Sequence, residues 1–145
     1  MYAIGNDHSA VALKEIIKAH LESKGIEVKD FGTESTTASN YAAKAEEVAN
    51  AVASGECERG ILICGTGIGM SIVANKVKGI RCALCDNLFS AEMTRRHNNS
   101  NMLSMGARVI SNQLALKIVD MFLDTPFEGG RHQRRVEKLM AIENE

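Results

Sequence analysis

Short apolar runs alternate along this chain with longer segments in which apolar residues recur every three or four positions. The short runs are rich in β-branched residues and are bounded by glycines and polar residues, which is typical of buried strands. They predict five strands, at residues 2–5, 27–31, 60–64, 81–85 and 102–105. The alternation of the two patterns predicts an α/β fold of three layers, in which a five-stranded, mostly parallel sheet is flanked by helices.

The segments between the short runs have the spacing of amphipathic helices. In the first segment, Leu13, Ile17 and Leu21 fall on one face, and the pattern ends at Gly25, a natural C-terminal cap. The second segment shows the same stripe and ends at Gly55. Further helices are predicted over residues 70–77, 88–96, 115–122 and about 131–142. Because no repeat or change of composition interrupts the chain, residues 1–145 are expected to form a single domain.

Polar side chains and glycines follow the carboxyl ends of several predicted strands. The pair Asp7-His8 comes directly after the first strand, and Cys64 opens the glycine-rich segment 65–69 after the third. The pair His97-Asn98 lies near the end of the helix that follows the fourth strand. Ligands bind beyond the carboxyl ends of the strands in open parallel sheets, so we expect these residues to converge on one site.

The segment Cys64-Gly65-Thr66-Gly67-Ile68-Gly69 carries the strongest chemical signal. Its glycines let a ligand approach the backbone amides closely, and the following helix start leaves unpaired N–H donors, which favours an anion. Next to those donors Cys64 could act as a thiolate, either nucleophile or base, or could be an inert buried cysteine. The glycine spacing matches neither a dinucleotide-binding loop nor a P-loop.

Four further basic residues have both a functional and a structural interpretation. Arg131 and Arg135 share one face of the last predicted helix and could bind a phosphate together, or could form a solvated basic face. His97 could transfer protons near neutral pH, or could stabilise the end of its helix. His8 could contact a phosphate, or could begin a helix capped by Asp7.

Composition and charge restrict the class of partner. A net charge of −1 gives no electrostatic support for binding nucleic acid or a membrane surface. The N-terminal residues have neither a basic leader nor a cleavage pattern, which predicts a cytoplasmic protein with free thiols. Cys82 and Cys85 lie within one predicted strand, which favours core packing over a redox or zinc pair, and no metal site is predicted. His20 and His132 are expected at the surface.

Taken together, a candidate thiolate, a loop of amide donors, a histidine and an arginine pair suit proton abstraction next to a carbonyl group. In such a reaction the arginines would hold a phosphate and the base would move a proton between adjacent carbons. The amide loop would stabilise the oxygen of the enediolate.

The chain resembles the type B ribose-5-phosphate isomerases and the related galactose-6-phosphate isomerase subunits, from residue 4 to about residue 142. The resemblance implies a Rossmann-like domain and aldose–ketose isomerisation through a cis-enediolate, with no metal or cofactor. It also implies a homodimer or dimer of dimers with shared active sites, and places the helix 131–142 at the dimer interface. The motifs that carry it are Gly5-Asn6-Asp7-His8, Asp30-Phe31-Gly32-Thr33, Ile63-Cys64-Gly65-Thr66-Gly67-Ile68-Gly69, Ala74-Asn75-Lys76, His97-Asn98 and Gly129-Gly130-Arg131-His132-Gln133 with Arg135.

The same resemblance implies a role for each candidate residue. Cys64 would be the base that moves the proton between carbons 2 and 1, and His97 would assist opening of the sugar ring. Thr66 and the amides from Gly65 to Gly69 would cradle the enediolate. The implied contacts to sugar oxygens, phosphate and other parts of the substrate come from Asp7, His8, Tyr41, Gly65, Gly67, Ile68, Gly69, Asn98, Arg108, Arg131 and Arg135, some of them supplied by the neighbouring subunit.

Three positions, Asn40, Ala42 and Asn99, depart from the pattern of this family. The chain has Asn40-Tyr41-Ala42 where the family usually has Asp-Tyr-Pro, in a polar segment, 32–41, that is long enough to form a wall or lid. It also has Asn99 where Asp is commoner. Ribose 5-phosphate is the leading substrate, a six-carbon aldose phosphate of the allose or galactose type is the second, and a non-catalytic phosphosugar-binding module is an alternative.

Overall fold

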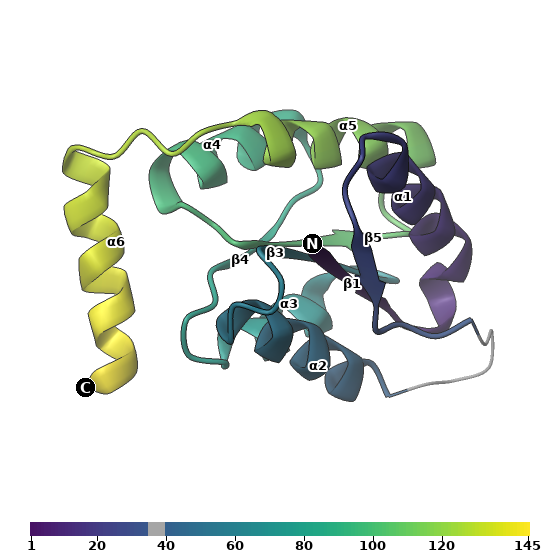
Figure 1. The fold of residues 1–145 in the computed structure, drawn as a ribbon, viewed down its shortest axis with the longest axis horizontal. Coiled ribbons are helices and arrows are strands. Elements are labelled where there is room, and N and C mark those ends of the chain that lie inside the picture. The colour runs from purple at the N-terminus through teal and green to yellow at the C-terminus, as the bar shows by residue number, and fades with distance from the viewer. Residues whose placement is uncertain (35–39) are drawn as a thin grey trace.

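Five parallel strands form one sheet in the computed structural model, which describes residues 1–34 and 40–145 (Figure 1). The order of the strands across the sheet is β2-β1-β3-β5-β4. Strands β1 and β3 therefore lie side by side near the centre, with β2 and β4 at the two edges. The strands are β1 (Tyr2–Asn6), β2 (Val28–Asp30), β3 (Arg59–Cys64), β4 (Cys82–Leu84) and β5 (Met102–Gly106).

Helices cover both faces of the sheet and complete the three predicted layers. Figure 1 shows α1, α4 and α5 on one face and α2 and α3 on the other, whereas α6 stands at one end of the molecule. Short 3-10 turns precede α1 (His8–Ala10) and follow α6 (Ile142–Asn144). The helices are α1 (Val11–Ser23), α2 (Tyr41–Ala53), α3 (Ile68–Asn75), α4 (Leu88–Asn98), α5 (Asn112–Asp124) and α6 (Arg131–Ala141).

The two-residue period of the strands divides the core into two halves. On β3, Ile61 and Ile63 pack with α1 and α5, while Leu62 and Cys64 pack with α2 and α3. Side chains along a strand point alternately to its two faces, so Cys64 faces the helix that follows it. The predicted fold class is confirmed.

The observed ends of two strands and the start of one helix differ from the predicted ones. Strand β2 pairs only with β1 and β4 only with β5, and each spans three residues, fewer than predicted. An edge strand has a ladder on one side only. Helix α3 begins at Ile68, two residues earlier than predicted, because Gly67 takes a left-handed conformation (φ 80°) as its N-cap.

The carboxyl ends of β1 and β3 form the switch point of the sheet, since the chain leaves them toward opposite edges. Open α/β sheets bind ligands at this point. The buried Asn6 stabilises the site from below. Its side chain accepts the N–H of Thr33 at 3.0 Å and donates to the carbonyl oxygens of Asp7 and Thr33.

The proposed wall or lid over residues 32–41 lies partly outside the described residues. Within the described ranges, no helix is long and apolar enough to cross a membrane.

Candidate active site

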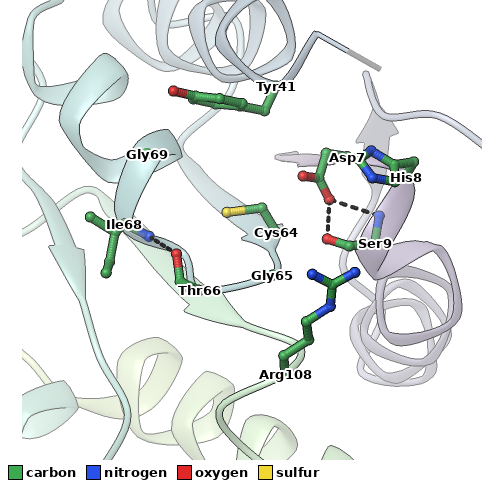
Figure 2. Close-up of a pocket in the computed structure, with 10 residues that line it drawn as sticks. All are labelled: Asp7, His8, Ser9, Tyr41, Cys64, Gly65, Thr66, Ile68, Gly69 and Arg108. Carbon is green, nitrogen blue, oxygen red and sulfur yellow. Dashed lines mark hydrogen bonds between the residues drawn. The ribbon is translucent and has the colours of Figure 1, made fainter. Parts of the chain in front are cut away.

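A pocket of about 430 Å³ opens at the carboxyl ends of β1 and β3 (Figure 2). Its volume lies in the range of small-molecule sites. Four segments that are far apart in sequence supply its wall, from the ends of β1, β3 and β5 and the start of α2. The lining residues are Asp7, His8, Ser9, Tyr41, Cys64, Gly65, Thr66, Ile68, Gly69 and Arg108. Nine of these were predicted as site residues, and Ser9 was not.

The Cys64 side chain projects into this pocket from the last position of β3 (Figure 2). It is 5% exposed, and its Sγ accepts the backbone N–H of Gly67 at 3.1 Å. A hydrogen bond from a backbone N–H binds a thiolate more strongly than a thiol. The pocket position and this donor favour a chemical role for Cys64 over that of an inert core cysteine.

The other three cysteines are free thiols in the core or at its margin. Burial raises the pKa of Cys82 to about 12 and that of Cys85 to about 11, and it also raises the pKa of Cys57. Because the thiolate is the reactive form, these cysteines are poor nucleophiles at neutral pH. Cys85 packs in one half of the core and Cys82 against the other half, which agrees with the predicted core packing of the two residues.

The loop after Cys64 has glycine where side chains would collide. A Cβ on Gly67 would lie 2.7 Å from Cδ1 of Leu84 and 2.8 Å from the backbone of Met105, and its φ of 80° is unfavourable for other residues. A Cβ on Gly69 would lie 2.7 Å from the ring of Tyr41, which roofs the pocket (Figure 2). The Thr66 hydroxyl accepts the N–H of Ile68 at 3.2 Å.

Asp7 both caps a helical turn and lines the pocket. Its Oδ1 accepts the N–H of Ser9 at 2.9 Å and the Ser9 hydroxyl at 2.5 Å. Arg108 reaches the pocket from the far side because its backbone N–H is bound to the carbonyl oxygen of Gly65 at 3.0 Å. Figure 2 shows its guanidinium group pointing toward Ser9. This arrangement provides a positive charge for an anionic substrate.

A second group of predicted residues lies elsewhere in the chain. His97 and Asn98 form the end of α4, and Arg131 and Arg135 are exposed on α6. None of these four belongs to the described lining of the Cys64 pocket. Within one chain, the structure therefore does not bring the predicted site residues together in one place.

His132 is buried, so the expectation that it lies at the surface was wrong. Its ring stacks on that of His97 with centroids 4.2 Å apart and planes 9° apart. Desolvation and the neighbouring charges of His97 and Arg131 lower the pKa of His132, against the opposing effect of Glu128, whose carboxylate lies 3.4 Å away. The contact explains the burial, since α6 packs on α4 through this pair.

His97, Glu128 and His132 also place their ligand atoms within 4.8 Å of one another. The in-plane lone pairs of two stacked imidazole rings lie in two nearly parallel planes, however, so the rings would have to rotate before both could bind one ion. We assign no metal to this group.

Two of the three departures from the family pattern, Asn40 and Asn99, have structural roles. The Asn40 side chain accepts the N–H groups of Ala42 at 3.1 Å and Ala43 at 3.3 Å, which caps α2. Asn99 ends α4 with a φ of 48°, and its Oδ1 accepts a bond from Arg95 at 3.0 Å. Asparagine tolerates the left-handed region better than most residues. Both side chains are therefore committed to the backbone or to a neighbour.

Comparison with known proteins adds independent information. The family model described as Ribose/Galactose Isomerase matches residues 2–139. The chain is 51% identical to ribose-5-phosphate isomerase B of Escherichia coli (strain K12) over 141 residues, which is 97% of this chain and 95% of that protein. It is 44% identical to D-erythrulose-4-phosphate isomerase of Pectobacterium atrosepticum, over 99% of this chain and 95% of that protein.

The fold of the chain also matches that of a solved structure. Ribose-5-phosphate isomerase B of Clostridium thermocellum superimposes with a TM-score of 0.97 at 50% sequence identity, covering 99% of this chain and 97% of that one.

Proposed function

Because the chain belongs to the ribose/galactose isomerase family, we propose that it interconverts ribose 5-phosphate and ribulose 5-phosphate. The observation that carries this proposal is the Cys64 sulfur, which faces the pocket and accepts a hydrogen bond from the glycine loop. That pairing supplies a base and a set of amide donors at one place. The four free thiols fit a cytoplasmic location, where reducing conditions prevail.

The proposed reaction begins with the open-chain aldose phosphate beside Cys64. The thiolate removes the proton from carbon 2, and the electron pair of that C–H bond forms the double bond between carbons 1 and 2. The carbonyl oxygen on carbon 1 becomes the enediolate oxygen, which the amides near Thr66 stabilise. The hydroxyl proton on oxygen 2 then passes to oxygen 1, and the thiol returns its proton to carbon 1, which gives the ketose.

The pocket of one chain supplies only part of this reaction. His97 and Asn98 are proposed to act on the sugar ring, and Arg131 and Arg135 on the phosphate, but all four lie outside it. A homodimer resolves the difficulty if these residues enter the pocket of the neighbouring subunit. The geometry of α6 supports this arrangement, since the helix lies at one end of the molecule (Figure 1) with Arg131 and Arg135 exposed.

An exposed apolar surface beside the pocket also supports the dimer. Ile68 is 50% exposed and lies at the pocket mouth, and a neighbouring hollow contains Ile68, Leu84 and Val109. Exposed apolar patches of this kind mark interaction sites. We propose that a second copy of the chain covers the surface formed by Ile68, Ile72, Leu84, Phe89 and Val109.

A substrate screen tests the proposal. The purified protein is offered ribose 5-phosphate, allose 6-phosphate, galactose 6-phosphate and D-erythrulose 4-phosphate, and kcat/KM is measured for each. We expect the highest value for ribose 5-phosphate. A higher kcat/KM for a six-carbon or four-carbon sugar phosphate would show that ribose 5-phosphate is not the preferred substrate. Calorimetric binding of these sugar phosphates without turnover of any of them would indicate a non-catalytic binding module.

Arg131→Ala is expected to raise KM for the phosphorylated substrate roughly 10- to 100-fold with a smaller effect on kcat, because it removes one charge-assisted contact to the phosphate. Steady-state kinetics on the intact dimer measures both constants. Arg134→Ala, an exposed arginine on the same helix, is the matched control. A fall in kcat with KM unchanged would contradict the anchoring role.

Asn40→Asp is expected to leave kcat/KM within about threefold of the wild-type value, because Asp caps a helix as well as Asn does. Asn40→Ala should instead lower the free energy of unfolding by about 1 kcal/mol through loss of the cap. Kinetics and thermal denaturation of the two variants check this. A tenfold change in kcat/KM for Asn40→Asp would show that the residue acts on the substrate.

A further inference from the structure

Ser104 is the one polar side chain of β5 and lies in the interior of the sheet. It is fully buried, between Leu62 on β3 and Leu84 on β4 in the strand register. A hydroxyl group in such surroundings is unfavourable unless it is hydrogen-bonded. The hydroxyl of Ser104 forms its hydrogen bond outside the sheet: Oγ donates to the carbonyl oxygen of Gly67 at 2.6 Å. Strand β5 thereby holds the glycine-rich loop that follows β3.

Gly67 is also the residue that reaches the thiol. Its N–H donates to Cys64 Sγ at 3.1 Å, while its carbonyl oxygen accepts both the Ser104 hydroxyl and the N–H of Ser71 at 3.1 Å. The backbone of Met105 lies directly beneath, where a Cβ on Gly67 would have no space. The Ser104 hydroxyl thus holds the carbonyl group of Gly67, and the N–H of the same residue contacts the proposed base, Cys64.

We propose that Ser104 is a positioning residue for Cys64: its hydroxyl holds Gly67 in the conformation that directs the Gly67 N–H at the sulfur. Without that bond, Gly67 gains conformational freedom, and its N–H bond to the sulfur, which favours the charged form of the thiol, is weakened. The expected effect on catalysis rests on the proposed function, in which Cys64 is the base. The expected effect on the reactivity of the Cys64 thiol does not depend on that function.

Other charges near the thiol are unaffected by a change at Ser104, since none of them contacts it in the bonds described. The first turn of α3 contributes only uncharged residues to the pocket. The titratable groups that share the pocket with Cys64 are Asp7 and His8 after β1, Tyr41 at the start of α2 and Arg108 after β5. A change in thiol reactivity would therefore report on the Gly67 contact.

The test is the rate of Cys64 alkylation by iodoacetamide as a function of pH, followed by mass spectrometry of the peptide that contains Cys64. In Ser104→Ala, we expect the midpoint of this profile to rise by about one pH unit, since one N–H bond to the thiolate is weakened. We also expect kcat to fall about tenfold with KM nearly unchanged. Ser104→Thr keeps the hydroxyl and should restore the wild-type profile.

Thr125→Val is the matched control. The Thr125 hydroxyl is bound to the carbonyl oxygen of Met121 at the same distance, 2.6 Å, and the residue is 5% exposed but lies at the end of α5. Its loss should lower thermal stability without moving the alkylation profile. Should Ser104→Ala lower stability equally and leave the profile at the wild-type position, the positioning role would be overturned.

Two further variants keep the outcomes distinct. If Ser104→Ala does not fold, Ser104→Cys occupies similar space with a weak donor and should give the same upward shift. If Cys64→Ala remains active while Ser104→Ala still shifts the profile, the positioning role stands and the proposed base is wrong.

Discussion

Cys64→Ala is expected to lower kcat for ribose 5-phosphate isomerisation by about 10³-fold, because it removes the group proposed to carry the proton between carbons 1 and 2. The sulfur lies in the pocket and accepts the Gly67 N–H, so the variant deletes the base without touching the phosphate contacts. KM should therefore change little. Coupled measurement of ribulose 5-phosphate formation gives both constants.

Cys57→Ala is the control for this substitution. Cys57 is also buried, on the same side of the sheet as Cys64, but it does not line the pocket. Its replacement should leave kcat near the wild-type value while costing some stability. If Cys64→Ala retained more than a tenth of the wild-type kcat, another residue would have to be the base.

Mixing two inactive variants is expected to restore activity. In a dimer of one Cys64→Ala chain and one His97→Asn chain, shared sites place both defects in one pocket and leave the other pocket intact. Such heterodimers should show about half of the wild-type turnover, as the two-fold symmetry of a shared pair of sites requires. Co-expression with two different affinity tags, followed by tandem purification, provides the heterodimer.

The opposite arrangement gives a clear alternative. If His97 served the pocket of its own chain, each site of the heterodimer would carry one defect, and turnover would stay at the level of the less impaired parent. A heterodimer of Cys64→Ala and wild-type chains is the control and should show about half activity under either arrangement.

The periodicity of the sequence was sufficient to predict the layers of the fold but not the order of its strands. Residues such as Ile61 and Leu62 alternate faces along β3, and that period is visible in the sequence. The insertion of β5 between β3 and β4 depends on crossover connections, which have no signal in local spacing. The edge strands β2 and β4 are shorter than predicted because each pairs with a single neighbour.

One part of the site could be predicted from local sequence, and the other part could not. The conformation of the segment from Cys64 to Gly69 is predictable because a strand, glycines and a helix follow one another in the sequence. The separation of His97 and Arg131 from that pocket depends on where α4 and α6 pack in the fold, which local spacing does not determine. The burial of His132 follows from its stacking on His97, a contact between distant segments.

The proposed positioning role of Ser104 could be predicted from the sequence only in part. A lone hydroxyl residue within the apolar run 102–105 is visible without a structure, but its partner is not. Only the fold brings its oxygen within 2.6 Å of Gly67.

Solvent exchange tests the central claim most directly. When the wild-type protein converts ribose 5-phosphate in D₂O, nuclear magnetic resonance should detect deuterium at carbon 1 of ribulose 5-phosphate and at carbon 2 of the recovered ribose 5-phosphate. Cys64→Ala should bind the sugar phosphate but show neither signal. Deuterium incorporation by Cys64→Ala at the wild-type rate would contradict proton transfer by this thiolate through an enediolate.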